Sequence, residues 1–172
     1  MRSELRKALP AVRVLPLTCE SFLEQTTDMR CFSFGQSLHY MSQNEVHRVL
    51  EVLPSGGHIL VVNNHPVGNN WLGEVSGYWH LMFPRSENPV AGQVKLLSDD
   101  LGAPETMAAE HELSLSPERA LGFISSLSSF TCLDRCQQEA ILAFGRAALV
   151  GHCGEDGQIS LTFRCEAHLW HR

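Results

Sequence analysis

The distribution of apolar residues predicts a strand, a helix and a second strand between residues 31 and 62. Cys31-Phe-Ser-Phe34 is a short apolar run, typical of a strand buried on both faces, and Gly35 ends it. Ser42-Gln-Asn-Glu45 is a capping-box pattern that predicts the start of a helix. Ile59-Leu-Val-Val62 predicts the second buried strand. The helix between them has one apolar face, with Val46, Val49, Leu50 and Leu53 at helical spacing. Short links make this a βαβ unit, so the two strands should be parallel.

The C-terminal segment shows the clearest two-residue period. Its polar positions are Ser160, Thr162, Arg164, Glu166 and His168, and its apolar positions are Ile159, Leu161, Phe163, Cys165, Ala167 and Leu169. Such alternation predicts a long strand with one buried face, and it favours antiparallel pairing. The expected fold class is therefore α/β, with a mostly parallel sheet and a C-terminal antiparallel strand.

The remaining segments give weaker signals. We expect a short helix over residues 2–9, a strand over Val12–Leu17, and a loop with a helical turn over residues 20–29. Residues 63–104 contain no clean period, so segment 63–115 is expected to be a cap or a loop-rich insertion. Ser116-Pro117 predicts the start of another helix.

A longer helix is expected after residue 131. Thr131 or Asp134 can cap it, and Gly151 lies just past its end. The face we expect it to bury carries Cys136, Ala140, Phe144 and Ala147.

Composition narrows the function. The 172 residues fit one domain, 44% of them are hydrophobic and 19% are charged. The net charge is −6 and no basic run is present, so nucleic-acid binding is not expected. The apolar runs are too short to cross a bilayer, and the first nine residues lack the apolar core of a signal peptide. We therefore expect a cytoplasmic protein that does not bind membranes and whose cysteines are reduced.

Six cysteines and nine histidines raise the question of a metal site. The sequence contains no Cys-x-x-Cys pair, which is the usual spacing of a structural zinc site. His168 and His171 would face opposite sides of one strand and so would not share an ion. We expect no metal. A serine hydrolase is not expected either, because the chain has no Gly-x-Ser-x-Gly elbow.

Residues 34–62 resemble the middle of a class I S-adenosylmethionine (SAM)-dependent methyltransferase of the small-molecule branch. The resemblance rests on Phe34-Gly-Gln-Ser-Leu-His-Tyr-Met41, on the capped helix, and on Leu53-Pro-Ser-Gly-Gly-His-Ile-Leu-Val-Val62. It implies a Rossmann-like sheet closed by an antiparallel hairpin, SAM as cofactor, and a small-molecule substrate. Val12–Glu20 is similar to the family's third strand and the turn after it.

The resemblance also assigns candidate site residues. It implies that Thr18, Cys19 and Glu20 lie on the adenine side of the cofactor. Gly35, Gln36 and Ser37 correspond to the segment that lies along the cofactor, at the sheet edge where such folds bind ligands. His39 is a candidate base or substrate contact, or else a histidine that only packs near the helix start. Trp71, Tyr78, Trp79 and Phe83 form either an aromatic wall over the substrate or ordinary core packing.

The chain also departs from the family. It contains no Gly-x-Gly, and the first strand, the glycine-rich loop and the acidic residue after the second strand have no counterpart. We therefore expect a single, partial methyltransferase domain over residues 1–172, incomplete on its N-terminal side. Two hypotheses follow: an enzyme that transfers a methyl group to a small molecule, or a non-catalytic remnant or isoform. Because the strand at Cys31–Phe34 would be an exposed edge, we expect the chain to be rearranged, to form a homodimer through that edge, or to be marginally stable.

Overall fold

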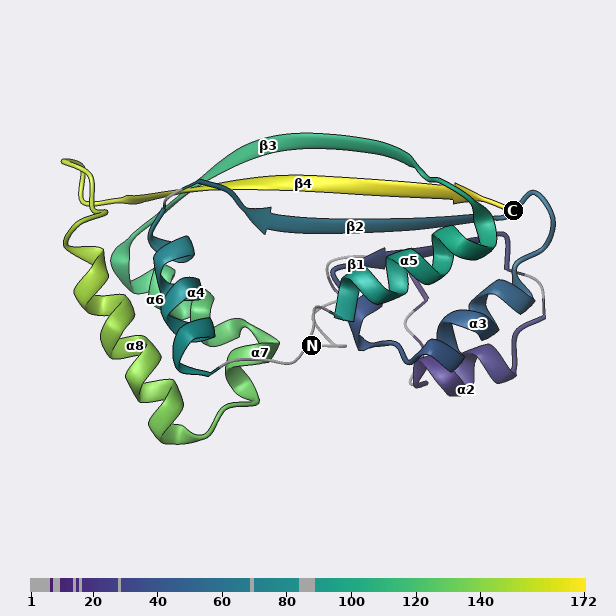
Figure 1. The fold of residues 1–172 in the computed structure, drawn as a ribbon, viewed down its shortest axis with the longest axis horizontal. Coiled ribbons are helices and arrows are strands. Elements are labelled where there is room, and N and C mark those ends of the chain that lie inside the picture. Colours follow the sequence, from purple (N-terminus) through teal and green to yellow (C-terminus); the bar gives the residue numbers. More distant parts are fainter. Residues whose placement is uncertain are drawn as a thin grey trace.

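A four-stranded mixed sheet runs the length of the molecule (Figure 1). The computed structural model describes residues 7, 10–13, 15, 17–27, 29–68, 70–83 and 89–172. The strand order is β1-β2-β4-β3. β1 and β2 are parallel, whereas β4 pairs antiparallel with both β2 and β3. The strands are β1 (Cys31–Gly35), β2 (His58–Pro66), β3 (Glu105–Leu115) and β4 (Ile159–His171).

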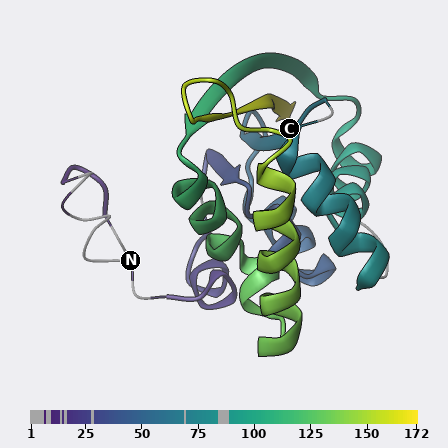
Figure 2. The same cartoon turned by 90° about the vertical axis from the view of Figure 1, so that its left-hand side faces the viewer.

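The helices form two groups beneath opposite ends of this sheet (Figure 1). One group contains α2 (Cys19–Glu24), α3 (Gln43–Val52) and α5 (Pro89–Leu101), together with the short 3-10 helix η1 (Leu38–Tyr40). The other contains α4 (Trp71–Met82), α6 (Pro117–Ser126), α7 (Ser128–Thr131) and α8 (Arg135–Leu149). Figure 2 shows α4, α6 and α8 side by side below the sheet.

Each helical group encloses its own hydrophobic core. The first core lies under β1 and β2 and contains Phe32, Ile59, Val61 and Leu97. The second core lies under the start of β4 and contains Trp71, Ile141, Ile159, Leu161 and Phe163. Trp170, near the end of β4, belongs to the first core. The odd-numbered residues at the start of β4 therefore point into the second core, whereas Trp170 near its end points into the first core. The twist of a long strand allows this change of face.

The predicted βαβ unit is confirmed. α3 begins with a complete capping box, in which Ser42 Oγ accepts from Glu45 N and the Glu45 carboxylate accepts from Ser42 N at 2.7 Å. The Pro-Ser-Gly-Gly turn needs both of its glycines. Gly56 has φ of +78°, and a Cβ at Gly57 would lie 2.6 Å from Leu53 Cδ1. β2 follows in parallel register with β1.

The long C-terminal strand is also confirmed as β4, and it lies antiparallel to its neighbours. Its burial follows the predicted alternation at Ile159, Leu161 and Phe163, whereas beyond Cys165 the fully buried residue is Trp170. The helix expected after residue 131 is α8, with Asp134 as its N-cap.

Several expectations are wrong. β1 is buried on one face only, because Phe32 points into the first core while Cys31 and Ser33 are exposed. α8 buries Ile141, Gly145 and Leu149, whereas Cys136 and Ala147 are exposed.

Two predicted elements concern the N-terminal segment. The described residues between 12 and 17 are not in a strand. The helix expected over residues 2–9 lies outside the described residues except for Lys7.

Segment 63–115 is not loop-rich. It contains the end of β2, the helices α4 and α5, and the whole of β3. The period of α4 was hidden because Trp, Tyr and Leu side chains lie on all sides of this helix, interrupted by two glycines. β3 carries helix-favouring Glu, Ala, Met and Leu, and residues 105–114 are all exposed. Its pairing with β4 overrides that local preference.

Candidate functional site at the carboxyl edge of the sheet

The carboxyl ends of β1 and β2 meet at one edge of the sheet because the two strands are parallel. Gly35 ends β1, and the backbone N–H of Gln36 donates to Val62 O at 2.9 Å. The Gln36 side chain turns along the same edge, where its Nε2 donates to Asn64 O at 3.4 Å. The structure thus brings Gly35, Gln36 and Ser37 beside the end of β2, which is where open α/β sheets bind their ligands.

Two features of this edge suit a ligand site. Gln36 has φ of +49°, a conformation that non-glycine residues adopt at a cost and that clusters at functional sites. A Cβ added to Gly35 would meet no atom within 4 Å, so the backbone there is open to a bound molecule.

Sequence reasoning missed the polar end of β2. Asn63 is buried, and Asn64 and His65 are exposed at the same edge. A signal was present, because three polar residues directly follow the apolar run Ile59–Val62. They went unnoticed because the strand was expected to end at Val62.

His39 lies one turn beyond this edge, on η1. Leu38 anchors η1 in the first core, and Gln93 Nε2 of α5 donates to Met41 O at 2.6 Å. The His39 ring lies against Tyr40, with 4.0 Å between ring centroids. Partial burial lowers the pKa of His39 below its ordinary value, which favours the neutral imidazole, the form able to accept a proton.

Thr18, Cys19 and Glu20 begin a helix instead of ending a strand. Thr18 is the N-cap of α2, and its Oγ1 accepts from Ser21 N at 3.2 Å. Partial burial of the thiol, followed by the nearby Glu45 carboxylate, raises the pKa of Cys19. Cys19 as a whole residue is exposed to solvent, so the burial affects mainly the environment of its sulfur atom. A thiol with a raised pKa is a weak nucleophile at neutral pH.

The two groups of predicted site residues are not joined. α2 packs against α3, and no described hydrogen bond or ion pair links residues 18–20 to residues 35–37. A shallow groove of about 370 Å³ lies between α2 and α3. Its lining residues are Glu20, Leu23, Glu24, Ser42, Asn44, Glu45 and Arg48. This groove holds three carboxylates. It includes Glu20 of the predicted site and no residue of the carboxyl edge, so it does not join the two groups.

The aromatic residues of α4 are packed into the second core. Trp71 is fully buried, and its Nε1 donates to Gly145 O of α8 at 2.8 Å. Tyr78 stacks on Phe144 with ring centroids 4.1 Å apart, and Trp79 is buried against Phe130. These contacts are those of ordinary core packing, the second of the two interpretations of Trp71, Tyr78 and Trp79 given above.

The carboxyl edge fits only part of a SAM molecule. It offers open backbone at Gly35 and the polar groups of Gln36 and Asn64. The backbone cradle for the methionine part and an acid for the ribose hydroxyls have no counterpart in the sequence, which has no Gly-x-Gly. At most, these residues would line one side of such a site.

The described part of the chain contains no cluster of three or more His, Cys, Asp or Glu side chains that could hold a metal ion. None of its helices is long and apolar enough to cross a membrane.

Comparison with known proteins identifies the fold. No protein-family model matches the chain, and no curated protein matches it in sequence. Among solved structures, a proposed type II methyltransferase from Anaeromyxobacter dehalogenans superposes with a TM-score of 0.62 at 15% identity, covering 94% of this chain and 72% of that one. The YcgJ protein from Bacillus subtilis gives 0.48 at 13% identity, covering 99% and 76%. A proposed methyltransferase from Bacillus halodurans gives 0.43 at 14%, covering 92% and 67%.

At such low sequence identities the similarity concerns the fold alone. Of these three structures, the one from A. dehalogenans supports the fold assignment, because its TM-score is 0.62. The superposition covers 94% of this chain. The chain therefore has a Rossmann-like α/β fold, which it shares with that structure.

Proposed function

We propose that the chain belongs to a SAM-dependent methyltransferase that acts on a small molecule. The observation that carries this proposal is the carboxyl edge of β1 and β2, where Gln36 holds a strained backbone beside an open Gly35. The A. dehalogenans structure, described as a methyltransferase, supports the same function through its shared fold.

The proposed division of labour places the cofactor along the edge and the substrate beyond it. In Figure 1 the arrowheads of β1 and β2 point toward the second helical group, so α4 and α6–α8 stand where a cap over the edge would stand. On this proposal residues 1–172 form one domain, and part of segment 63–115 contributes to its cap.

SAM supplies an electrophilic methyl group, and transfer needs a nucleophile held in line with it in a dry site. The residues of this chain would position and shield the reactants. Gln36 and Ser37 would line the cofactor, with Thr18, Cys19 and Glu20 on its adenine side. His39, held neutral by its surroundings, would accept the proton of a substrate that loses one.

The direct test is calorimetric titration of the chain with SAM and with S-adenosylhomocysteine. We expect one site per chain or per dimer. Gly35→Leu should weaken binding by roughly tenfold or more, because its side chain fills the open space at the edge. Gly122→Leu is the matched control, since it adds the same side chain in equally open space on α6, away from the edge.

A second function is a non-catalytic one, in which the chain acts through protein association. Its support is the sequence itself, which lacks the glycine-rich loop and shows no replacement for it. Absence of any heat from folded protein at millimolar ligand would reject cofactor binding by this chain and favour this second function.

A further inference from the structure

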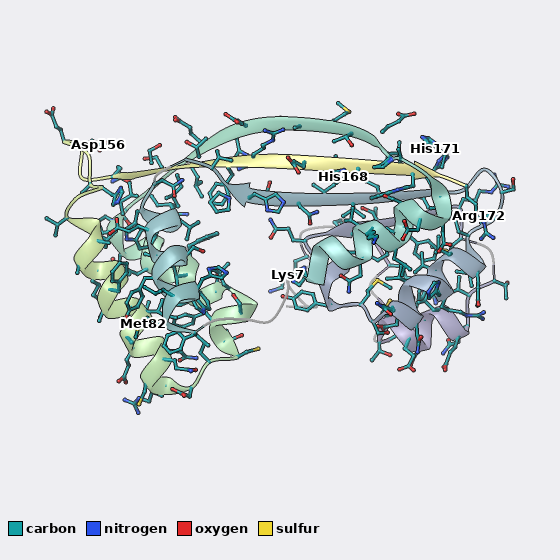
Figure 3. The ribbon with its side chains drawn as sticks, in the orientation of Figure 1. Lys7, Met82, Asp156, His168, His171 and Arg172 are labelled. Carbon is teal, nitrogen blue, oxygen red and sulfur yellow. The ribbon has the colours of Figure 1, made fainter. Side chains whose placement is uncertain are left out.

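A pair of histidines faces each other across β2 and β4, far from the carboxyl edge. His58 is the first residue of β2 and His171 the last of β4, and the antiparallel register places them directly opposite. Their Nδ1 atoms lie 3.0 Å apart and their rings are nearly perpendicular, at 87°. His58 is partly exposed and the His171 side chain is 49% exposed, so both are open to solvent. Figure 3 labels His171 close to the C-terminal end of β4.

A carboxylate on the third strand orients this pair. His171 Nε2 lies 3.3 Å from the Oε1 atom of Glu105, the first residue of β3. A neutral His171 that donates its Nε2–H to Glu105 keeps the lone pair on Nδ1, which points toward His58. Histidine ligands of metals characteristically have such a carboxylate partner on the other ring nitrogen.

The positively charged side chain of Arg172 does not occupy the space beside the two imidazoles. Arg172 follows His171 and therefore points to the opposite face of the strand. There its guanidinium donates to the carbonyl oxygens of Leu50 and Leu53. The two imidazoles and Glu105 thus share the sheet face away from Arg172.

The two Nδ1 atoms are within hydrogen-bond distance of each other, and the same spacing also suits two nitrogens that share one ion. Metal–nitrogen bonds to histidine are about 2.0–2.1 Å long. Two ligands at about 90°, as in square-planar or octahedral coordination, then lie about 2.9 Å apart, and two tetrahedral ligands about 3.4 Å apart. The observed 3.0 Å is closer to the first value.

We propose that His58 and His171 form a two-histidine site for a divalent transition-metal ion, oriented by Glu105 and completed by water. The geometry and the intrinsic order of metal affinity both predict that Cu²⁺ binds most tightly, then Ni²⁺, then Zn²⁺. Hard ions such as Mg²⁺ and Ca²⁺ prefer oxygen ligands and should not bind. Because the site fastens the start of β2 to the end of β4, bound metal stabilises the sheet.

This site was not predicted from sequence for a clear reason. His168 and His171 are close in sequence but lie on opposite faces of β4. The actual partner of His171 is 113 residues away in the chain, and only the β2–β4 register reveals it.

The test is titration of the untagged chain with Cu²⁺, Ni²⁺, Zn²⁺ and Mg²⁺, followed by calorimetry and by thermal unfolding. We expect one Cu²⁺ site per chain, a rise in Tm, and an electron paramagnetic resonance spectrum with two nitrogen ligands.

Variants separate this site from the other histidines. His58→Gln and His171→Gln should each weaken Cu²⁺ binding on the order of tenfold or more, and Glu105→Gln by about tenfold with both ligands still present. His47→Gln removes a similarly exposed histidine on α3 and should leave affinity unchanged. Unfolding curves without metal would show that every variant is folded. Equal affinity in wild type, His58→Gln and His171→Gln would overturn the proposal, as would the absence of Cu²⁺ binding.

Discussion

At the scale of single residues, Gln36 shows where the backbone departs from ordinary geometry. It is the one described non-glycine residue with positive φ, at 49°. That conformation costs about 1–2 kcal/mol for a residue with a Cβ, and more for a β-branched one. Gln36→Gly removes this strain, but glycine loses more conformational entropy on folding. The net effect should lie between no change and a stabilisation of up to about 1 kcal/mol.

The matched variant is Gln36→Val, which should destabilise the protein by at least about 1 kcal/mol. Urea unfolding of both variants and wild type gives the comparison. If the edge binds cofactor, Gln36→Gly should also weaken binding while it keeps or raises stability. A glycine variant that is the less stable of the two would contradict the strained geometry.

His39 carries a pH dependence whose sign follows from its lowered pKa. Because burial favours the neutral ring in the folded state, the unfolded chain takes up a proton more readily as pH falls below the ordinary value of 6.5. Wild type should lose stability relative to His39→Gln between about pH 7.5 and about pH 5.5. The effect should be small because much of the ring is exposed. Urea midpoints of both proteins at the two pH values test it, and a stability gain of wild type at low pH would reverse the argument.

At the scale of elements, the sequence predicted correctly those features that depend on residues close together in the chain. The capping box of α3, the Pro-Ser-Gly-Gly turn and the alternation at the start of β4 each depend on residues close in sequence. β3 and α4 depend on partners that are distant in sequence. β3 is a strand because it pairs with β4, and α4 is held as a helix by its packing against α8. The candidate site follows the same rule, because Gly35–Ser37 lies in the confirmed βαβ unit. The pairing of His58 with His171 depends on the register of β2 and β4.

The second core depends on the contact between α4 and α8, which Trp71 makes, and Trp170 of the first core provides the reference. Trp71 is fully buried and donates to Gly145 O. Trp170 is equally buried, and its Nε1 has no hydrogen-bond partner among the described residues. Both Trp→Phe substitutions lose similar apolar volume. Trp71→Phe should therefore cost about 1–3 kcal/mol more than Trp170→Phe, because it alone removes a hydrogen bond. Urea unfolding of the two variants decides this, and equal losses would show that the bond to Gly145 contributes nothing.

At the scale of the whole molecule, the sheet has two edges, and β1 forms one of them. Within the described residues β1 pairs only with β2. Arg30 O accepts from His58 N, and Gln36 N donates to Val62 O, so the alternate residues Cys31, Ser33 and Gly35 direct their backbone groups away from β2. An edge of this kind is a template for a strand of another chain.

We therefore predict that the chain forms a homodimer through β1, and that Ser33 is the position at which to test it. Ser33→Pro removes one outward N–H and leaves the bonds to β2 intact, so it should shift the chain toward monomer. Ser33→Thr keeps the donor in a good strand residue and should remain dimeric. Sedimentation velocity over a concentration series measures the state of each, with far-UV circular dichroism to show that all are folded. A folded wild-type monomer at every concentration, or a Ser33→Pro dimer as tight as wild type, would exclude association through this edge.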